Sequence, residues 1–139
     1  MIEPCLAYQT AVRAALIADA DVTALVPADH IRAGSTRPDK LPCIILGDGA
    51  TEFLGRASGS QFLARVSLTL HIWAIEDGAD MAKAIGFAVM NALTDAPAAT
   101  GFSIDEHEMP TVIWLRDPQP ELAYTHGVAQ LEAVIRWGV

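Results

Sequence analysis

The middle of the chain combines two hydrophobic periods. Apolar and polar residues alternate over Gln61–Ile75, and this period of two predicts a half-buried strand. Apolar residues then recur at helical spacing over Gly78–Asp95, which predicts an amphipathic helix. We expect the strand and the helix to pack against each other through four apolar side chains: Leu70, Ile72, Ile85 and Val89.

Turn and capping residues separate these two elements. Glu76-Asp77-Gly78 interrupts the apolar pattern. Asp77 is placed to cap the helix, and Asp80 adds negative charge to its first turn, where the helix dipole favours an acid. His71 faces away from the apolar side of the strand, so we expect it on the polar face.

The rest of the chain gives further elements by the same patterns. They are helices at Pro4–Asp19 and Asp21–Val26, a loop at Ala28–Pro42, a short strand at Cys43–Leu46, a linking loop at Ala50–Ser60, strands at Ile104–Leu115 and Thr125–Trp137, and a turn at Arg116–Pro120. Pro110 has no backbone N–H to donate, so the strand that contains it should lie at an edge or carry a bulge.

The order α-α-β-β-α-β-β defines the expected fold class. Neighbouring strands joined by short links favour a mostly antiparallel sheet with helices packed on one face, which is an α+β fold. With 139 residues, we expect a single domain spanning 1–139.

The chain is acidic, and this bears on whether it can bind nucleic acid. Seventeen Asp and Glu residues face nine Lys and Arg, for a formal net charge of −8. Binding to phosphates needs clustered cations, so we expect the chain not to bind nucleic acid through its phosphates. The charge can also serve solubility alone. The nearest approach to a basic patch is Arg32, Arg37 and Lys40, and Asp29 and Asp39 lie among them.

Cysteine usage and hydropathy point to the compartment. Cys5 and Cys43 make no disulfide framework, and no signal-peptide pattern is present, so we expect reduced thiols in a protein made in the cytoplasm. No apolar run approaches the ~20 residues that span a bilayer, and we expect no membrane contact.

The sequence offers little catalytic chemistry. The four histidines (His30, His71, His107 and His126) stand in no metal-binding spacing. Asp105-Glu106-His107-Glu108 is the densest group of possible ligands, and we interpret it as a solvated acidic turn or strand edge. GxSxG, GxGxxG and GxxxxGK[ST] motifs do not occur. We therefore assign no catalytic, cofactor-binding or metal-binding residues.

Seven segments keep a characteristic order and spacing. They are Val12–Val26, Ile31-Arg32, Leu41–Gly47, His71-Ile72-Trp73, Ala82–Leu93, Leu115–Pro118 and Tyr124–Val128. Together they resemble the tail completion family of long-tailed bacteriophages and gene transfer particles. The stretch Asp105–Pro110 departs from that family, because it is more acidic and is broken by a proline, and this puts the edge pairing there in question.

The resemblance implies a structural virion protein, and the family has no catalytic residues to carry over. Such proteins look like tail terminators, which form a six-membered ring on the head-proximal end of the tail tube, stop its polymerisation and meet the head-side connector. Tail-to-head joining (neck) proteins share the fold, and both roles stay open at this point. The implied partners are copies of the same chain, the tail tube protein and the connector, with DNA passing through the ring.

We assign the subunit interface to Phe53, Leu54, Arg56 and Trp114. Phe53 and Leu54 are apolar residues within a glycine-containing loop, which we expect to become ordered against a neighbouring subunit. Trp114 has a core position as its alternative. Two other classes compete with the tail protein: a small enzyme or ligand-binding domain, which a deep pocket with a perturbed His or carboxylate would favour, and a small regulatory module of the toxin–antitoxin kind.

Overall fold

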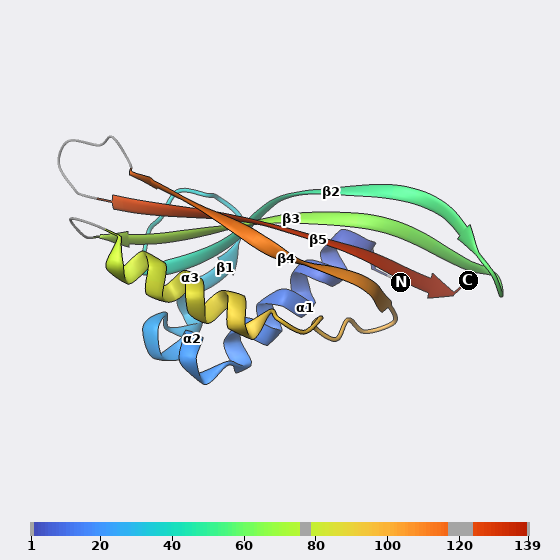
Figure 1. Cartoon of the computed structure of the whole chain (residues 1–139), viewed down its shortest axis with the longest axis horizontal. Coiled ribbons are helices and arrows are strands. Elements are labelled where there is room, and N and C mark those ends of the chain that lie inside the picture. The colour runs from blue at the N-terminus through green and yellow to red at the C-terminus, as the bar shows by residue number, and fades with distance from the viewer. Residues whose placement is uncertain (1, 76–78, 117–123, 139) are drawn as a thin grey trace.

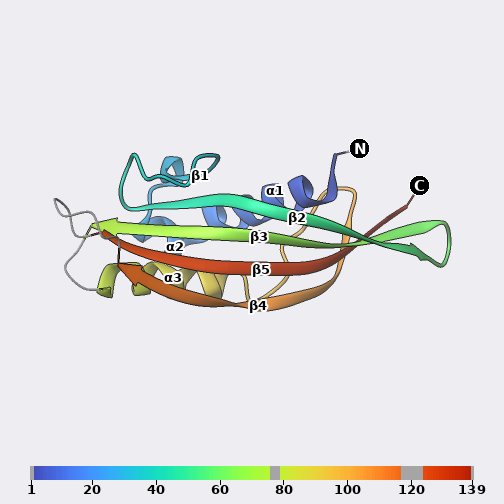
Figure 2. The same ribbon diagram turned by 90° about the horizontal axis from the view of Figure 1, so that it is seen from above.

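The chain forms a twisted five-stranded sheet with helices on one face (Figures 1 and 2). The computed structural model describes residues 2–75, 79–116 and 124–138. The elements are α1 (Pro4–Ala18), α2 (Ala20–Leu25), the 3-10 turn η1 (Ala28–His30), β1 (Ile31–Ala33), β2 (Cys43–Ala57), β3 (Gln61–Ile75), α3 (Asp80–Ala92), β4 (Ser103–Arg116) and β5 (Tyr124–Gly138).

The strand order in the sheet is β1-β2-β3-β5-β4. Among the described strands, only the pairing of β1 with β2 is parallel, and the other three pairings are antiparallel. Helices α1, α2 and α3 all lie against the same face of the sheet (Figure 1). The α+β class, the antiparallel character and the one-sided helical layer are therefore as the sequence predicts.

Local capping explains where the first two helices begin. Glu3 precedes α1, and its carboxylate accepts a hydrogen bond from the Leu6 N–H at 2.9 Å. Asp19 separates α1 from α2 and accepts from the N–H groups of Asp21 and Val22, both at 3.0 Å. These carboxylates satisfy backbone donors that have no partner within the helix.

The core lies between the helices and the strands. Leu70 and Ile72 of β3 are fully buried, as are Ile85 and Val89 of α3, which confirms the predicted packing of strand against helix. The alternating residues of β5 face the same core: Ala129, Leu131, Ala133 and Ile135. Burying this much apolar surface is the main favourable contribution to folding.

The edge strand β4 carries the acidic stretch. It pairs with β5 along Ser103–Arg116, with bulges at Ile104/Glu106 and Glu108/Thr111. Pro110 lies in the second bulge of this edge strand, which confirms the prediction made from its missing N–H. The interpretation of Asp105–Glu108 as a strand edge is also confirmed. His107 within it turns to the helical side, where its ring nitrogens contact the Tyr8 hydroxyl at 3.3 Å and the Leu93 carbonyl at 2.9 Å.

Two predicted boundaries near β2 are wrong. The short strand at Cys43–Leu46 continues as β2 to Ala57, so most of the predicted loop at Ala50–Ser60 is strand paired with β3. Glycines that suggested a loop instead occupy bulges at Gly47/Gly49 and Phe53/Gly55. A bulge bends a strand without ending it and accepts glycine for its unusual backbone angles. Only the turn between Ala57 and Gln61 remains outside the strands.

A further correction concerns the predicted loop at Ala28–Pro42. It contains η1 and the three-residue strand β1, whose residues pair in parallel with Ile44–Leu46. Helix α3 is shorter than predicted, with Asp80 in its first turn. The predicted cap Asp77 and the predicted turn beyond Arg116 lie outside the described residues, while Arg116 itself belongs to β4.

Two further findings concern the cysteines and the hydropathy of the helices. Both cysteines are free thiols; Cys5 is partly buried and Cys43 is buried, and burial raises the pKa of the Cys43 thiol to about 11. Within the described residues, no helix has the length and apolar character needed to cross a membrane.

Candidate functional site

The distal halves of β2 and β3 form a hairpin that extends past the helical layer (Figures 1 and 2). We call the segment from Thr51 to Val66 the arm. Its turn has positive φ angles at Gly59 and Ser60 (72° and 59°), a conformation that glycine adopts easily and that suits tight hairpins. Ala64 and Val66 of the arm are buried, but its exposed residues, Phe53 among them, are not covered by the protein's own helices.

Aromatic side chains gather on the helical side of the arm. The Trp137 ring at the end of β5 lies 6.2 Å from Phe53, 6.0 Å from Phe62 and 5.8 Å from Phe102, measured between ring centroids. We call these four residues the aromatic patch. Phe53 is 69% exposed. Exposed aromatic groups of this kind are typical of surfaces that bind other proteins.

A cation accompanies the aromatic patch. The guanidinium carbon of Arg56 lies 5.1 Å from the centroid of the Phe62 ring, within the range of a cation–π interaction. Leu54 occupies the bulge beside Phe53 and is 40% exposed. Three of the four residues that the sequence assigned to an interface, Phe53, Leu54 and Arg56, are thus brought together on the arm.

Trp114 is placed apart from those three. Its ring lies between Gly86 of α3 and Gly127 of β5, and a methyl group added to either glycine would come within 2.5 Å of a ring carbon. The ring is partly buried and packs against the core. Trp114 thus holds the edge strand against α3, which is the core alternative that the sequence left open for it.

An open groove lies between α2 and α3. It has a volume of about 370 Å³ and is lined by Asp21, Ala24, Leu25, Ala84, Phe87, Ala88 and Asn91. Phe87 is 70% exposed. We call this feature the α2–α3 groove. Sequence reasoning missed it, although a signal was present: Phe87 falls between Ile85 and Val89 and therefore off the buried stripe of the helix.

The helix-free face of the sheet is acidic at its centre. Arg65 of β3 forms ion pairs with Glu52 at 3.3 Å and with Glu132 at 2.9 Å. Glu132 stands opposite Glu108 in the β4–β5 register, a like-charge pair that destabilises unless a cation lies nearby. Arg65 supplies that cation, and the local charge still remains negative.

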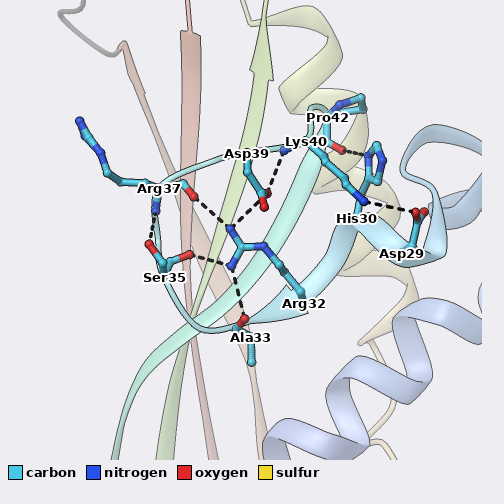
Figure 3. Close-up of polar contacts among 9 residues, drawn as sticks. All are labelled: Asp29, His30, Arg32, Ala33, Ser35, Arg37, Asp39, Lys40 and Pro42. Atoms are coloured by element: carbon cyan, nitrogen blue, oxygen red, sulfur yellow. Dashed lines mark hydrogen bonds and ion pairs between the residues drawn. The ribbon is translucent and has the colours of Figure 1, made fainter.

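A loop folds over the other end of this helix-free face. Arg32 of β1 holds it by donating hydrogen bonds to the carbonyls of Ser35 and Arg37, at 2.9 and 3.0 Å, and to the Asp39 carboxylate at 3.3 Å (Figure 3). His30 also contacts the Pro42 carbonyl at 2.8 Å (Figure 3). Arg32 is therefore engaged within its own chain and is unlike a free phosphate-binding cation.

Beside this loop, two histidines stack with a tryptophan. The Nδ1 atom of His71 lies 2.8 Å from Nε2 of His126, and the His126 ring stacks on Trp73 at 3.9 Å between centroids. His71 faces away from the core, as predicted, but it is buried. Among the described residues, no group of three or more His, Cys, Asp or Glu is placed to hold a metal ion.

Acidification is expected to destabilise the protein through His71. Burial lowers the pKa of His71, and the nearby Asp48 opposes this only in part. The unfolded chain, in which the histidine pKa is about 6.5, therefore binds the proton more readily than the folded state. The contribution of neutral His71 to the free energy of unfolding is therefore complete above about pH 6.5. It is lost as the pH falls from there towards the lower pKa of His71 in the folded state.

Urea unfolding at about pH 7.5 and about pH 5.5 checks this expectation. Between these two pH values, the free energy of unfolding should decrease less for His71→Gln than for the wild type. The matched control is His30→Gln, which removes one imidazole on η1 and outside the stack. Equal pH slopes for His71→Gln and the wild type would contradict the assignment.

Exposed apolar surfaces such as those on the arm and in the groove are typical of proteins that assemble with others. The family model for tail completion protein gp17 matches residues 10–136. The chain therefore belongs to the tail completion protein gp17 family, as the sequence resemblance implied. Members of this family are structural virion proteins, so the chain is a phage-type tail component and not an enzyme.

Solved structures share the fold. One is a chain in the virion of a native gene transfer agent particle, with a TM-score of 0.66, 20% identity, and coverage of 92% of this chain and 93% of that chain. Another is the bacteriophage SPP1 gp17 protein, with a TM-score of 0.56, 21% identity, and coverage of 93% and 88%. A comparison with curated proteins finds no match.

Proposed function

We propose that six copies of this chain form a ring at the head-proximal end of a phage-like tail. The ring would stop polymerisation of the tail tube and offer a surface to the head-side connector. Membership in the tail completion family is the observation that carries the proposal. The similarity in fold to a chain of a gene transfer agent virion supports it.

The shape of the subunit is compatible with a closed ring. A ring is built from head-to-tail contacts, in which two different surfaces of identical subunits meet and the rotation closes. The arm and the α2–α3 groove are two such surfaces on one subunit. Strand edges and exposed aromatic groups commonly supply contacts of this kind.

The negative charge of the chain supports the proposal that DNA passes through the ring without binding to it. With −8 on each chain, six times −8 gives −48 on a ring. A channel lined with carboxylates repels phosphates and so leaves the nucleic acid free to slide. Because like charges must also approach as the ring closes, we expect closure to be favoured by added salt, which screens their repulsion.

Electron cryomicroscopy of particles that carry this chain tests the proposal. We expect one ring of six copies between the end of the tail tube and the head-side connector. Tails from which the chain has been removed should have uncontrolled tube lengths and no attached heads. A different copy number, or a position away from the head-proximal end, would overturn the terminator role.

The isolated protein is expected to bind duplex DNA no better than a non-specific background. Among the described residues, at least four of the nine cations already form ion pairs within the chain: Arg32, Lys40, Arg65 and Arg136. A gel-shift titration at about 50 mM salt measures this, because phosphate binding is strongest at low salt and weakens steeply as salt is added. Micromolar binding with such a salt dependence would contradict the prediction and favour a neck protein that grips DNA.

A further inference from the structure

Two phenylalanines are the most exposed large apolar side chains of the described residues. Phe87 is 70% exposed and Phe53 is 69% exposed. Phe53 belongs to the arm, which extends at one end of the long axis, whereas Phe87 belongs to α3, a helix that lies towards the other end (Figure 1). Each contacts a cluster of further apolar groups that could bury it: the aromatic patch around Phe53, and the apolar walls of the α2–α3 groove around Phe87.

Opposite charges accompany the two phenylalanines. Arg56 lies on the same face of the arm as Phe53, and within the described part of the chain it takes part in no ion pair. Asp21 lines the groove that holds Phe87. Its carboxylate likewise forms no ion pair with any described residue. The arm thus offers an aromatic group beside a cation that has no carboxylate partner among the described residues. The groove offers an aromatic group beside a carboxylate that has no cationic partner among them.

We propose that the arm of one copy lies in the α2–α3 groove of the next copy. Phe53 would pack against Phe87, and Arg56 would pair with Asp21. This rests on the proposed ring and names the surfaces that close it. Burying two aromatic side chains in one contact supplies the apolar centre that stable interfaces have, and the ion pair at its rim fixes the orientation.

A second copy of the chain is the occupant that fits the geometry. The arm extends at one end of the subunit, and helices α2 and α3, which line the groove, lie towards the other end (Figures 1 and 2). An arm therefore cannot reach its own groove. The two surfaces are different yet complementary, which is the requirement for a head-to-tail contact that repeats around a ring. A two-fold dimer in which each arm enters the partner's groove would stop at two copies, whereas the head-to-tail contact continues around the proposed ring.

Cysteine cross-linking within assembled tails tests the contact. A chain with Phe53→Cys and Phe87→Cys should give covalent oligomers up to six chains on oxidation, visible as a ladder on non-reducing gels. The unmodified chain and each single variant are controls for the native thiols of Cys5 and Cys43. The matched control Phe87→Cys with Met109→Cys places the second thiol on β4, at a side chain that is also exposed (51%), and should give no ladder.

Charge reversal provides a second test that does not depend on thiol geometry. Arg56→Asp or Asp21→Arg alone is expected to lower the fraction of ring-bearing tails about fivefold or more, because the loss of an exposed ion pair recurs at every contact of the ring. Combining both changes in one chain restores opposite charges at each contact and should recover most of the rings. Phe53→Ser with Leu54→Ser should impair ring formation while leaving the melting temperature within about 2 °C of the wild type.

The outcomes separate this inference from the ring itself. A six-membered ring in which the Phe53→Cys, Phe87→Cys chain gives no ladder and the doubly reversed chain gives no rescue would overturn the arm-and-groove contact and keep the proposed function. A ladder or a rescue in an assembly of another copy number would keep the contact and overturn the six-membered ring.

Discussion

Replacing Leu70 with alanine should lower the free energy of unfolding by about 2–5 kcal/mol. Leu70 is fully buried in β3, the strand that lies between β2 and β5 in the sheet. Its truncation removes apolar contacts with the helical layer and leaves a cavity, because strands paired on both sides can relax little. Ile85→Ala should have a similar effect from the helical side of the same contact.

Denaturant unfolding measures these two changes directly. Ile113→Ala is the matched control, since this side chain on β4 is 58% exposed and its truncation should change stability by less than about 0.5 kcal/mol. If Leu70→Ala and Ile85→Ala both unfold at the wild-type denaturant concentration, the core has been assigned to the wrong faces.

Alanine at Gly86 or Gly127 should lower the free energy of unfolding by about 1–3 kcal/mol, because the core would be overpacked. For Gly86 in α3, the direction of the change in the free energy of unfolding is informative. Glycine inside a helix is normally less favourable than alanine by about 0.5–1 kcal/mol, so an unobstructed exchange would stabilise. Here the new methyl group would stand 2.4 Å from a carbon of the Trp114 ring, and the ring must move.

A double-variant experiment isolates the tryptophan as the cause. In a Trp114→Leu background the obstruction is removed, and Gly86→Ala should then cost much less or stabilise. Gly138→Ala is the control, since an added methyl group there meets no atom within 4 Å. A stabilising Gly86→Ala in the wild-type background would show that Trp114 does not occupy this position.

The elements that could be predicted from the sequence are those with a strong period. In β3 and β5 the apolar residues alternate because one face contacts the helices and the other does not. The face of α3 that carries Ile85 and Val89 followed from helical spacing for the same reason. Pro110 placed its strand at a bulged edge through a single missing donor. In each case a local rule and the tertiary structure agree.

The remaining features depend on contacts between distant segments. Gly55 and Gly59 have the same composition signal, yet one lies in a bulge and the other in a turn, and the distinction comes from pairing with β3. The three residues of β1 are a strand only because β2 lies beside them. The groove beside Phe87 exists because α2 and α3 are neighbours, which no local pattern states.

The bulged edge at β4 also bears on unwanted pairing between copies of the chain. An open sheet edge invites another copy to add as an extra strand, and such stacking leads to irregular aggregates. Pro110 removes one donor from this edge, the two bulges spoil its straightness, and two identical edges would bring Glu106 and Glu108 against the same carboxylates. The geometry and charge of this edge therefore work against irregular stacking of copies through β4.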